Sequence, residues 1–152
     1  MPLVEIITGS KSDLPALEPC TNMLAELGID HEVHVMSAHR TPQKVQRFAV
    51  EAAEKGTEVI IAAAGMAAHL PGVVAAWTHL PVIGVPVAQA GGSAVSGLDS
   101  LLSIAQMPPG VPVGCMSVNG SKNAALYAAA ILALKHDSVR EALLAFRAKQ
   151  SA

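Results

Sequence analysis

Three short segments of the sequence combine side chains that can bind an anion with side chains that can transfer a proton. The segment 9–13, Gly-Ser-Lys-Ser-Asp, precedes a predicted helix, whose free backbone N–H groups and dipole favour a phosphate. The segment 37–42, Ser-Ala-His-Arg-Thr-Pro, contains Arg40, which can form paired hydrogen bonds to a phosphate or carboxylate, and His39, which can transfer a proton near neutral pH. The third segment, 64–69, is Ala-Gly-Met-Ala-Ala-His. Together they predict a site for a small anionic molecule.

The third segment ends an apolar run that begins at Val59, a pattern typical of a strand buried on both faces of a parallel sheet. Ligands of open α/β sheets bind just beyond the carboxyl ends of the strands. His69 would stand there beside a floor of small residues that includes Ala64 and Gly65, which leaves room for a flat polar molecule. The alternative is a structural histidine at the edge of the core, bonded to backbone.

Ser10, Ser12 and Asp13 have two readings. The hydroxyl groups can donate to a phosphate, and the Asp13 carboxylate is placed to accept from a ribose hydroxyl. Helix capping is the simpler explanation of Ser12 and Asp13 taken alone, because both residue types are favoured at a helix start. The segment matches neither a Walker loop nor a Gly-x-Gly-x-x-Gly motif.

The polar segments are positioned by a regular alternation of predicted strands and helices along 1–152, which we interpret as one domain. Apolar runs and turn residues predict strands at 3–8, 29–36, from 59, 81–87 and 111–118. Helical spacing, proline and glycine predict helices at 14–27, 42–55, through 73–77, 98–107, 122–135 and 139–149. Caps are expected from Ser12 or Asp13, from Thr41 and from a capping box at 138–141. Strands that each precede a helix predict a three-layer α/β/α fold with a doubly wound, parallel, five-stranded sheet of the flavodoxin or Rossmann type.

Composition narrows the functional class. About half of the residues (51%) are apolar and only 14% are charged, an excess that we interpret as surface buried between subunits. The formal net charge of −2 without a basic patch disfavours a nucleic-acid partner. Every apolar run is too short for a membrane span, and the N-terminus enters a strand directly instead of resembling a signal peptide. Two cysteines without metal-like spacing suggest free thiols in the cytoplasm.

The remaining histidines suggest no metal site. His31 and His34 lie on a predicted strand and His136 at a helix end, where structural roles are expected, while His79 could serve either purpose. The sequence contains no helical i, i+4 histidine pair and no neighbouring carboxylate cluster, so we expect no metal.

Taken together, the motifs resemble class I of the PurE family over nearly the whole chain. The resemblance rests on the segments 9–13, 37–42, Ala-Ala-His-Leu-Pro-Gly at 67–72, Gly-Val-Pro-Val at 84–87 and 98–108. It implies an enzyme of purine synthesis that moves a carboxylate from N5 to C4 of an aminoimidazole ribonucleotide, without cofactor or metal. It also implies a homo-octamer with active sites at the subunit contacts.

The resemblance also suggests individual roles. His39 would be the catalytic acid and base, and His69 the second active-site histidine. Arg40 and the loop of Ser10 would bind the phosphate, with Asp13 also on the ribonucleotide. The further residues implied to line the substrate site are Ser12, Ser37, Ala64, Gly65 and Leu70. One histidine suits this chemistry, because a proton must reach nitrogen when the N–CO₂ bond breaks and must leave carbon after C4 attacks CO₂.

Two segments depart from the class I pattern, and three alternatives stay open. The segment 88–95 is longer than the pattern and 118–123 is shorter, which affects the loops expected to cover the site. Class II of the family carboxylates aminoimidazole ribonucleotide with CO₂ directly, but Arg40 and the 69–72 ending favour class I. A related family carboxylates a nicotinate dinucleotide and lacks the 37–42 motif. The third alternative is a non-catalytic nucleotide-binding module.

Overall fold

The sheet is parallel throughout, as the alternation of elements predicts. A computed structural model describes residues 1–91 and 95–152. Its five strands are β1 (Val4–Thr8), β2 (His31–Val35), β3 (Val59–Gly65), β4 (Val82–Val87) and β5 (Gly114–Cys115). They pair in the order β2-β1-β3-β4-β5, the order of flavodoxin-like sheets, so the predicted fold class is confirmed.

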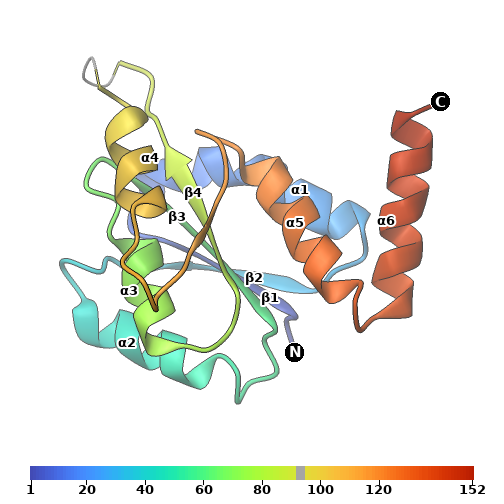
Figure 1. Cartoon of the computed structure of the whole chain (residues 1–152), viewed down its shortest axis with the longest axis horizontal. Coiled ribbons are helices and arrows are strands. Elements are labelled where there is room, and N and C mark those ends of the chain that lie inside the picture. Colours follow the sequence, from blue (N-terminus) through green and yellow to red (C-terminus); the bar gives the residue numbers. More distant parts are fainter. Residues whose placement is uncertain (92–94) are drawn as a thin grey trace.

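Helices cover both faces of the sheet (Figure 1). They are α1 (Leu14–Glu26), α2 (Pro42–Glu51), α3 (Leu70–Trp77), α4 (Leu98–Ala105), α5 (Ser121–Leu132) and α6 (Asp137–Gln150), with a short 3₁₀ turn, η1 (Lys11–Asp13), before α1. Buried side chains of α1, α5 and α6 pack on one face, and those of α2, α3 and α4 on the other. The two helical layers and the sheet between them form the predicted three-layer arrangement. In the described residues, no helix is long and apolar enough to span a membrane.

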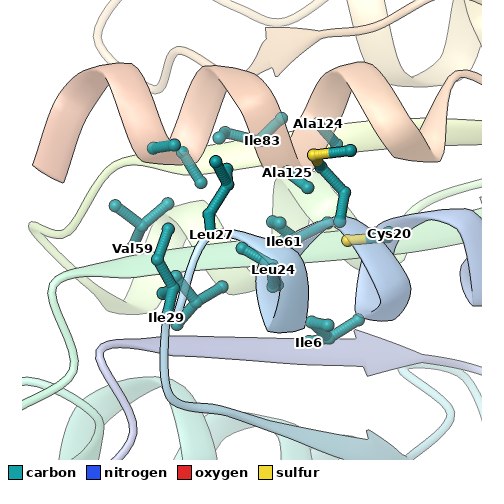
Figure 2. Close-up of a cluster of buried hydrophobic side chains, with 14 of the residues drawn as sticks. Ile6, Cys20, Leu24, Leu27, Ile29, Val59, Ile61, Ile83, Ala124 and Ala125 are labelled. Atoms are coloured by element: carbon teal, nitrogen blue, oxygen red, sulfur yellow. The ribbon is translucent and has the colours of Figure 1, made fainter. Parts of the chain in front are cut away.

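The core depends on strands that are buried on both sides. Ile6, Ile61 and Ile83 face α1 and α5, and Figure 2 shows them between the sheet and the helices with Ala124 and Ala125. Small residues at these α5 positions let the helix lie close to the strands. Cys20 belongs to the same cluster, and burial raises the pKa of its thiol to about 12, so it is an inert packing residue.

The last strand and some helix starts differ from the boundaries that were predicted from short sequence motifs. The strand expected at 111–118 is regular only at Gly114–Cys115, because it lies at the sheet edge and Pro112 has no N–H to pair. The predicted capping box at 138–141 is wrong: α6 begins at Asp137, two residues before the predicted start, and Ser138 lies inside its first turn. Asp13 and Thr41 do occupy the predicted N-cap positions of α1 and α2, but neither side chain makes the capping hydrogen bond.

Strand β2 forms the other edge of the sheet and carries exposed apolar side chains. Val33 and Val35 are 38% and 40% exposed, and they border a shallow groove together with Leu14 of α1. The half-exposed strand expected from the sequence is therefore present, but its apolar face is not covered within one chain.

A polar cluster joins the start of β3 to the end of α5. Glu58 accepts hydrogen bonds from Lys135 Nζ at 2.6 Å and from His136 Nε2 at 3.0 Å. Burial alone would raise the pKa of the Glu58 carboxyl, but the two hydrogen bonds and the charges of Lys135 and His136 outweigh it, so the pKa is lowered. The cluster thus stabilises the fold when Glu58 is ionised.

Glu58→Gln should lower the free energy of unfolding at neutral pH by up to about 1 kcal/mol, the range of exposed ion pairs. Because the folded-state pKa lies below the ordinary value of 4.5, this contribution is complete above that pH and is lost as the pH falls through the folded-state pKa. Urea denaturation at a series of pH values measures it. Glu54→Gln, at an exposed carboxylate, is the control and should show no such dependence. A pH-independent difference for Glu58→Gln would contradict the assignment.

Candidate active site

A cavity of about 700 Å³ lies at the carboxyl ends of the strands, where the sequence predicted a ligand site. Its walls come from the segments that follow β1, β2, β3 and β4. All ten residues singled out in the sequence line it: Ser10, Ser12, Asp13, Ser37, His39, Arg40, Ala64, Gly65, His69 and Leu70. The structure therefore brings the predicted residues together, and their individual roles remain predictions.

The β1 loop presents two hydroxyl groups in a fixed arrangement. Ser10 is in an extended conformation and caps η1 by accepting from the Ser12 backbone N–H at 3.3 Å. The two hydroxyl groups are also hydrogen-bonded to each other at 2.8 Å. Both side chains stay exposed to the cavity, where they can donate to anionic oxygens.

Asp13 is held as an acceptor inside the site instead of capping α1. It is only 5% exposed, and it accepts from Thr8 Oγ1 at 3.3 Å and from Gln89 Nε2 at 3.1 Å. Gln89 Nε2 also donates to Ser12 Oγ at 3.2 Å. These bonds orient the carboxylate before any ligand arrives, and Gln89 is a site residue that sequence reasoning missed.

The β2 loop places Arg40 next to the β1 loop. Ser37 accepts from the Arg40 backbone N–H at 3.1 Å, and Thr41 Oγ1 donates to the Ser37 carbonyl at 3.0 Å, which closes the turn before α2. The Arg40 guanidinium then reaches across and donates to the Gly9 carbonyl at 3.2 Å. A permanent positive charge thus stands close to the segment that holds the Ser10 and Ser12 hydroxyl groups.

The two predicted histidines form a direct pair. His39 Nε2 and His69 Nδ1 are 2.8 Å apart, with the ring planes nearly perpendicular at 82°. One nitrogen must donate and the other accept, so the two rings share one proton at this contact. The structure favours the site reading of His69 over a core-edge histidine bonded to backbone, and the pair can transfer a proton.

The end of β3 provides the floor. Ala64 is nearly buried, and a Cβ at Gly65 would come 3.1 Å from the Val87 carbonyl oxygen, so glycine permits a close approach of β3 and β4. Met66 has a positive φ of 56°, which is uncommon for a residue other than glycine and turns the chain sharply toward His69. Leu70 begins α3 at the rim. Small and apolar groups therefore line this part of the cavity.

The sequence predicted a covering loop at 88–95 but no individual site residue on the side of the cavity that follows β4. The described lining residues from this side are Val87, Gln89, Ser96 and Asp99. Their signal was position, because a fourth parallel strand must also end at this edge. Val87 and Asp99 also lie in the segments 84–87 and 98–108 that carry the family resemblance. Asn119 fixes the start of the loop with two hydrogen bonds to the Ala88 backbone. Of the covering loop expected at 88–95, residues 92–94 lie outside the described residues.

Comparison with known protein families matches residues 3–152 to the family described as AIR carboxylase. A Pseudomonas aeruginosa protein named N5-carboxyaminoimidazole ribonucleotide mutase is 56% identical over 151 residues, covering 98% of this chain and 91% of that protein. A Pyrococcus abyssi protein of the same name is 52% identical over 147 residues, covering 97% and 83%.

A solved structure agrees at the level of the fold. The crystal structure of Treponema denticola PurE superposes with a TM-score of 0.88 at 28% identity, covering 99% of this chain and 92% of that one. The sequence is therefore much nearer to the two proteins named as mutases than to this structure.

Proposed function

This chain belongs to the AIR carboxylase family, and we propose that it is an N5-carboxyaminoimidazole ribonucleotide mutase of purine biosynthesis. The identity of more than half to relatives of that name supports the activity, which is an isomerisation. The observation that carries the mechanism is the hydrogen-bonded pair of His39 and His69 in a cavity lined also by Arg40 and Asp13. We propose that residues 1–152 form one catalytic domain.

The ribonucleotide would bind across the β1 and β2 loops. Arg40 and the Ser10 and Ser12 hydroxyl groups would hold the phosphate, since a guanidinium and hydroxyl donors suit its oxygens. Asp13, already oriented by Thr8 and Gln89, would accept from the ribose hydroxyls. The aminoimidazole ring would then lie toward the histidine pair and the β3 floor. Ser37, Ala64, Gly65 and Leu70 would complete the substrate site.

The reaction requires one carboxylate to leave nitrogen and attach to carbon. Cleavage of the N5–carboxylate bond releases CO₂ while N5 accepts a proton, and C4 then attacks CO₂ and loses its own proton. His39 would supply the first proton and remove the second, so the histidine ends as it began. His69, bonded to His39, holds the ring and shares that proton. The apolar floor, 62–68, would keep CO₂ from hydration between the two steps.

A second candidate, direct carboxylation of aminoimidazole ribonucleotide by dissolved CO₂, is suggested by the description of the family. It needs the same ring site and the same proton removal from C4. The two activities differ in the origin of CO₂, and that difference can be measured.

We further propose assembly into a homo-octamer in the cytoplasm. Exposed apolar side chains support a subunit interface: Leu14, Val33, Val35, Trp77, Leu98, Leu102, Val118, Tyr127, Leu134 and Leu144. Leu134 is 87% exposed, which is costly unless another chain covers it. Two free cysteines agree with a reducing compartment.

His39→Asn should lower turnover by about 10²–10⁴-fold while the ribonucleotide still binds, because asparagine keeps a polar group but cannot transfer the proton. Steady-state kinetics and calorimetric titration with the product measure the two effects. His69→Asn should also lower turnover. His79→Asn, at an exposed histidine outside the cavity, should not. Near-normal turnover of His39→Asn would refute its role.

A labelling experiment separates the two candidate activities. Substrate that carries a labelled carboxylate should yield product that retains most of the label in a large pool of unlabelled bicarbonate, because CO₂ stays in the cavity. Extensive loss of label within one turnover would identify the carboxylase instead.

Light scattering should report a particle of eight chains, each of 15.6 kDa. A monomer at micromolar concentration would contradict the octamer and leave the proposed chemistry of one chain untouched.

A further inference from the structure

Three side chains that can bind a metal meet between β1, β2 and α2, away from the cavity. Glu5 lies opposite Glu32 in the parallel register of β1 and β2, and His34 follows on the same face of β2. Their ligand atoms, one from each residue, all lie within 4.8 Å of one another. None of the three lines the cavity described above.

Glu5 and His34, the two less exposed residues of this cluster, each have a buried atom without a hydrogen-bond partner. Among residues 1–91 and 95–152, Glu5 Oε2 and His34 Nε2 are two of three buried side-chain atoms without a hydrogen-bond partner. Glu5 is only 4% exposed, and its Oε1 lies 3.7 Å from His34 Nε2, beyond hydrogen-bond distance. A buried polar atom without a partner is costly, so an unpartnered carboxylate oxygen and an unpartnered imidazole nitrogen in one cluster indicate a place for a cation.

The surrounding charge is negative and does not neutralise the cluster. The nearby ammonium of Lys55 is engaged by Glu51 at 2.9 Å. Its pKa is raised first by the hydrogen bond and charge of Glu51, with smaller contributions from the charges of Glu5 and Glu32. Among residues 1–91 and 95–152, the two carboxylates therefore face one imidazole, with no lysine or arginine paired to either of them.

We propose that Glu5, Glu32 and His34 form a binding site for Zn²⁺. One imidazole nitrogen and two carboxylate oxygens are a donor set that zinc accepts, with ligand distances of about 2.0–2.2 Å and therefore neighbouring ligand atoms about 3.3 Å apart. The 3.7 Å between Glu5 and His34 needs only a small side-chain adjustment to reach this spacing. Glu32 is exposed, so the ion can enter from that side and water can complete its coordination.

The site would be structural. It joins the edge strand β2 to β1, and the His34 ring is supported by Phe48 of α2 at a centroid distance of 5.0 Å. The proposal is independent of the mutase activity, because it involves neither the histidine pair nor the substrate loops.

Calorimetric titration of the chelator-treated full-length protein with Zn²⁺, combined with metal analysis after dialysis, tests the site. We expect one ion per chain and a zinc-dependent rise in melting temperature. Glu32→Gln, Glu5→Gln and His34→Asn should each weaken zinc binding by about tenfold or more, as loss of supporting groups at metal sites does. Glu32 is on the surface, so its variant should fold even if the buried variants do not.

His31→Asn is the matched control, because His31 lies on the same strand but on its other face, and its Nδ1 contacts the Ile29 carbonyl at 2.9 Å. It should bind zinc as the wild type does. Absence of saturable binding would overturn the proposal. So would binding that survives Glu32→Gln and His34→Asn but is lost in His39→Asn, since the ion would then belong to the cavity.

Discussion

Parallel pairing of β3 with β1 on one side and β4 on the other is the constraint on which this structure depends. Every residue of β3 except the last is buried, so helices must cover both faces of the sheet. Parallel strands then end at one edge, and each ends in a loop that turns back into a helix. The loops that carry the polar side chains meet because no other placement would bury β3.

The meeting of these loops at one edge also lets their polar side chains orient one another by hydrogen bonds. Asp13 and Arg40 lie in loops of different strands, yet Asp13 is oriented by Thr8 and Gln89, and Arg40 reaches the Gly9 carbonyl. Because these groups are already hydrogen-bonded, the protein does not have to order them when a ligand binds, which favours affinity. The histidine pair follows the same principle, since contact with His69 restricts the ring of His39 before the reaction begins.

The same parallel register produces the cluster of Glu5, Glu32 and His34, which lies outside the cavity. In a mostly apolar sheet, acidic and imidazole groups on adjacent strands of one face are forced into proximity by the strand spacing of about 4.8 Å. Here Glu5 and His34 have limited access to water, whereas Glu32 is exposed, and the three groups stay close together. Parallel pairing thus brings together the loops at the strand ends and also the side chains of neighbouring strands on one face of the sheet.

Much of this arrangement follows from local patterns in the sequence. The apolar run from Val59 and the alternation of elements predicted the α/β/α fold, because a strand buried on both faces requires two helical layers. The three loops that hold most of the candidate residues were predicted to meet because they follow strands, and strand ends share one edge. The family resemblance completed the set, Leu70 included. Helix caps were predicted less well. Asp13 suits a helix start, but in the folded protein its carboxylate accepts hydrogen bonds from Thr8 and Gln89 instead of capping the helix.

Only the tertiary structure decided which distant groups touch. Gln89 is 76 residues from Asp13, and His69 is 30 residues from His39, separations at which local sequence carries no distance information. The exact register of β1 against β2, which places Glu5 opposite Glu32, depends on how both helical layers pack. Local sequence therefore determines what each segment can do, whereas packing of the whole chain determines which partner each side chain meets.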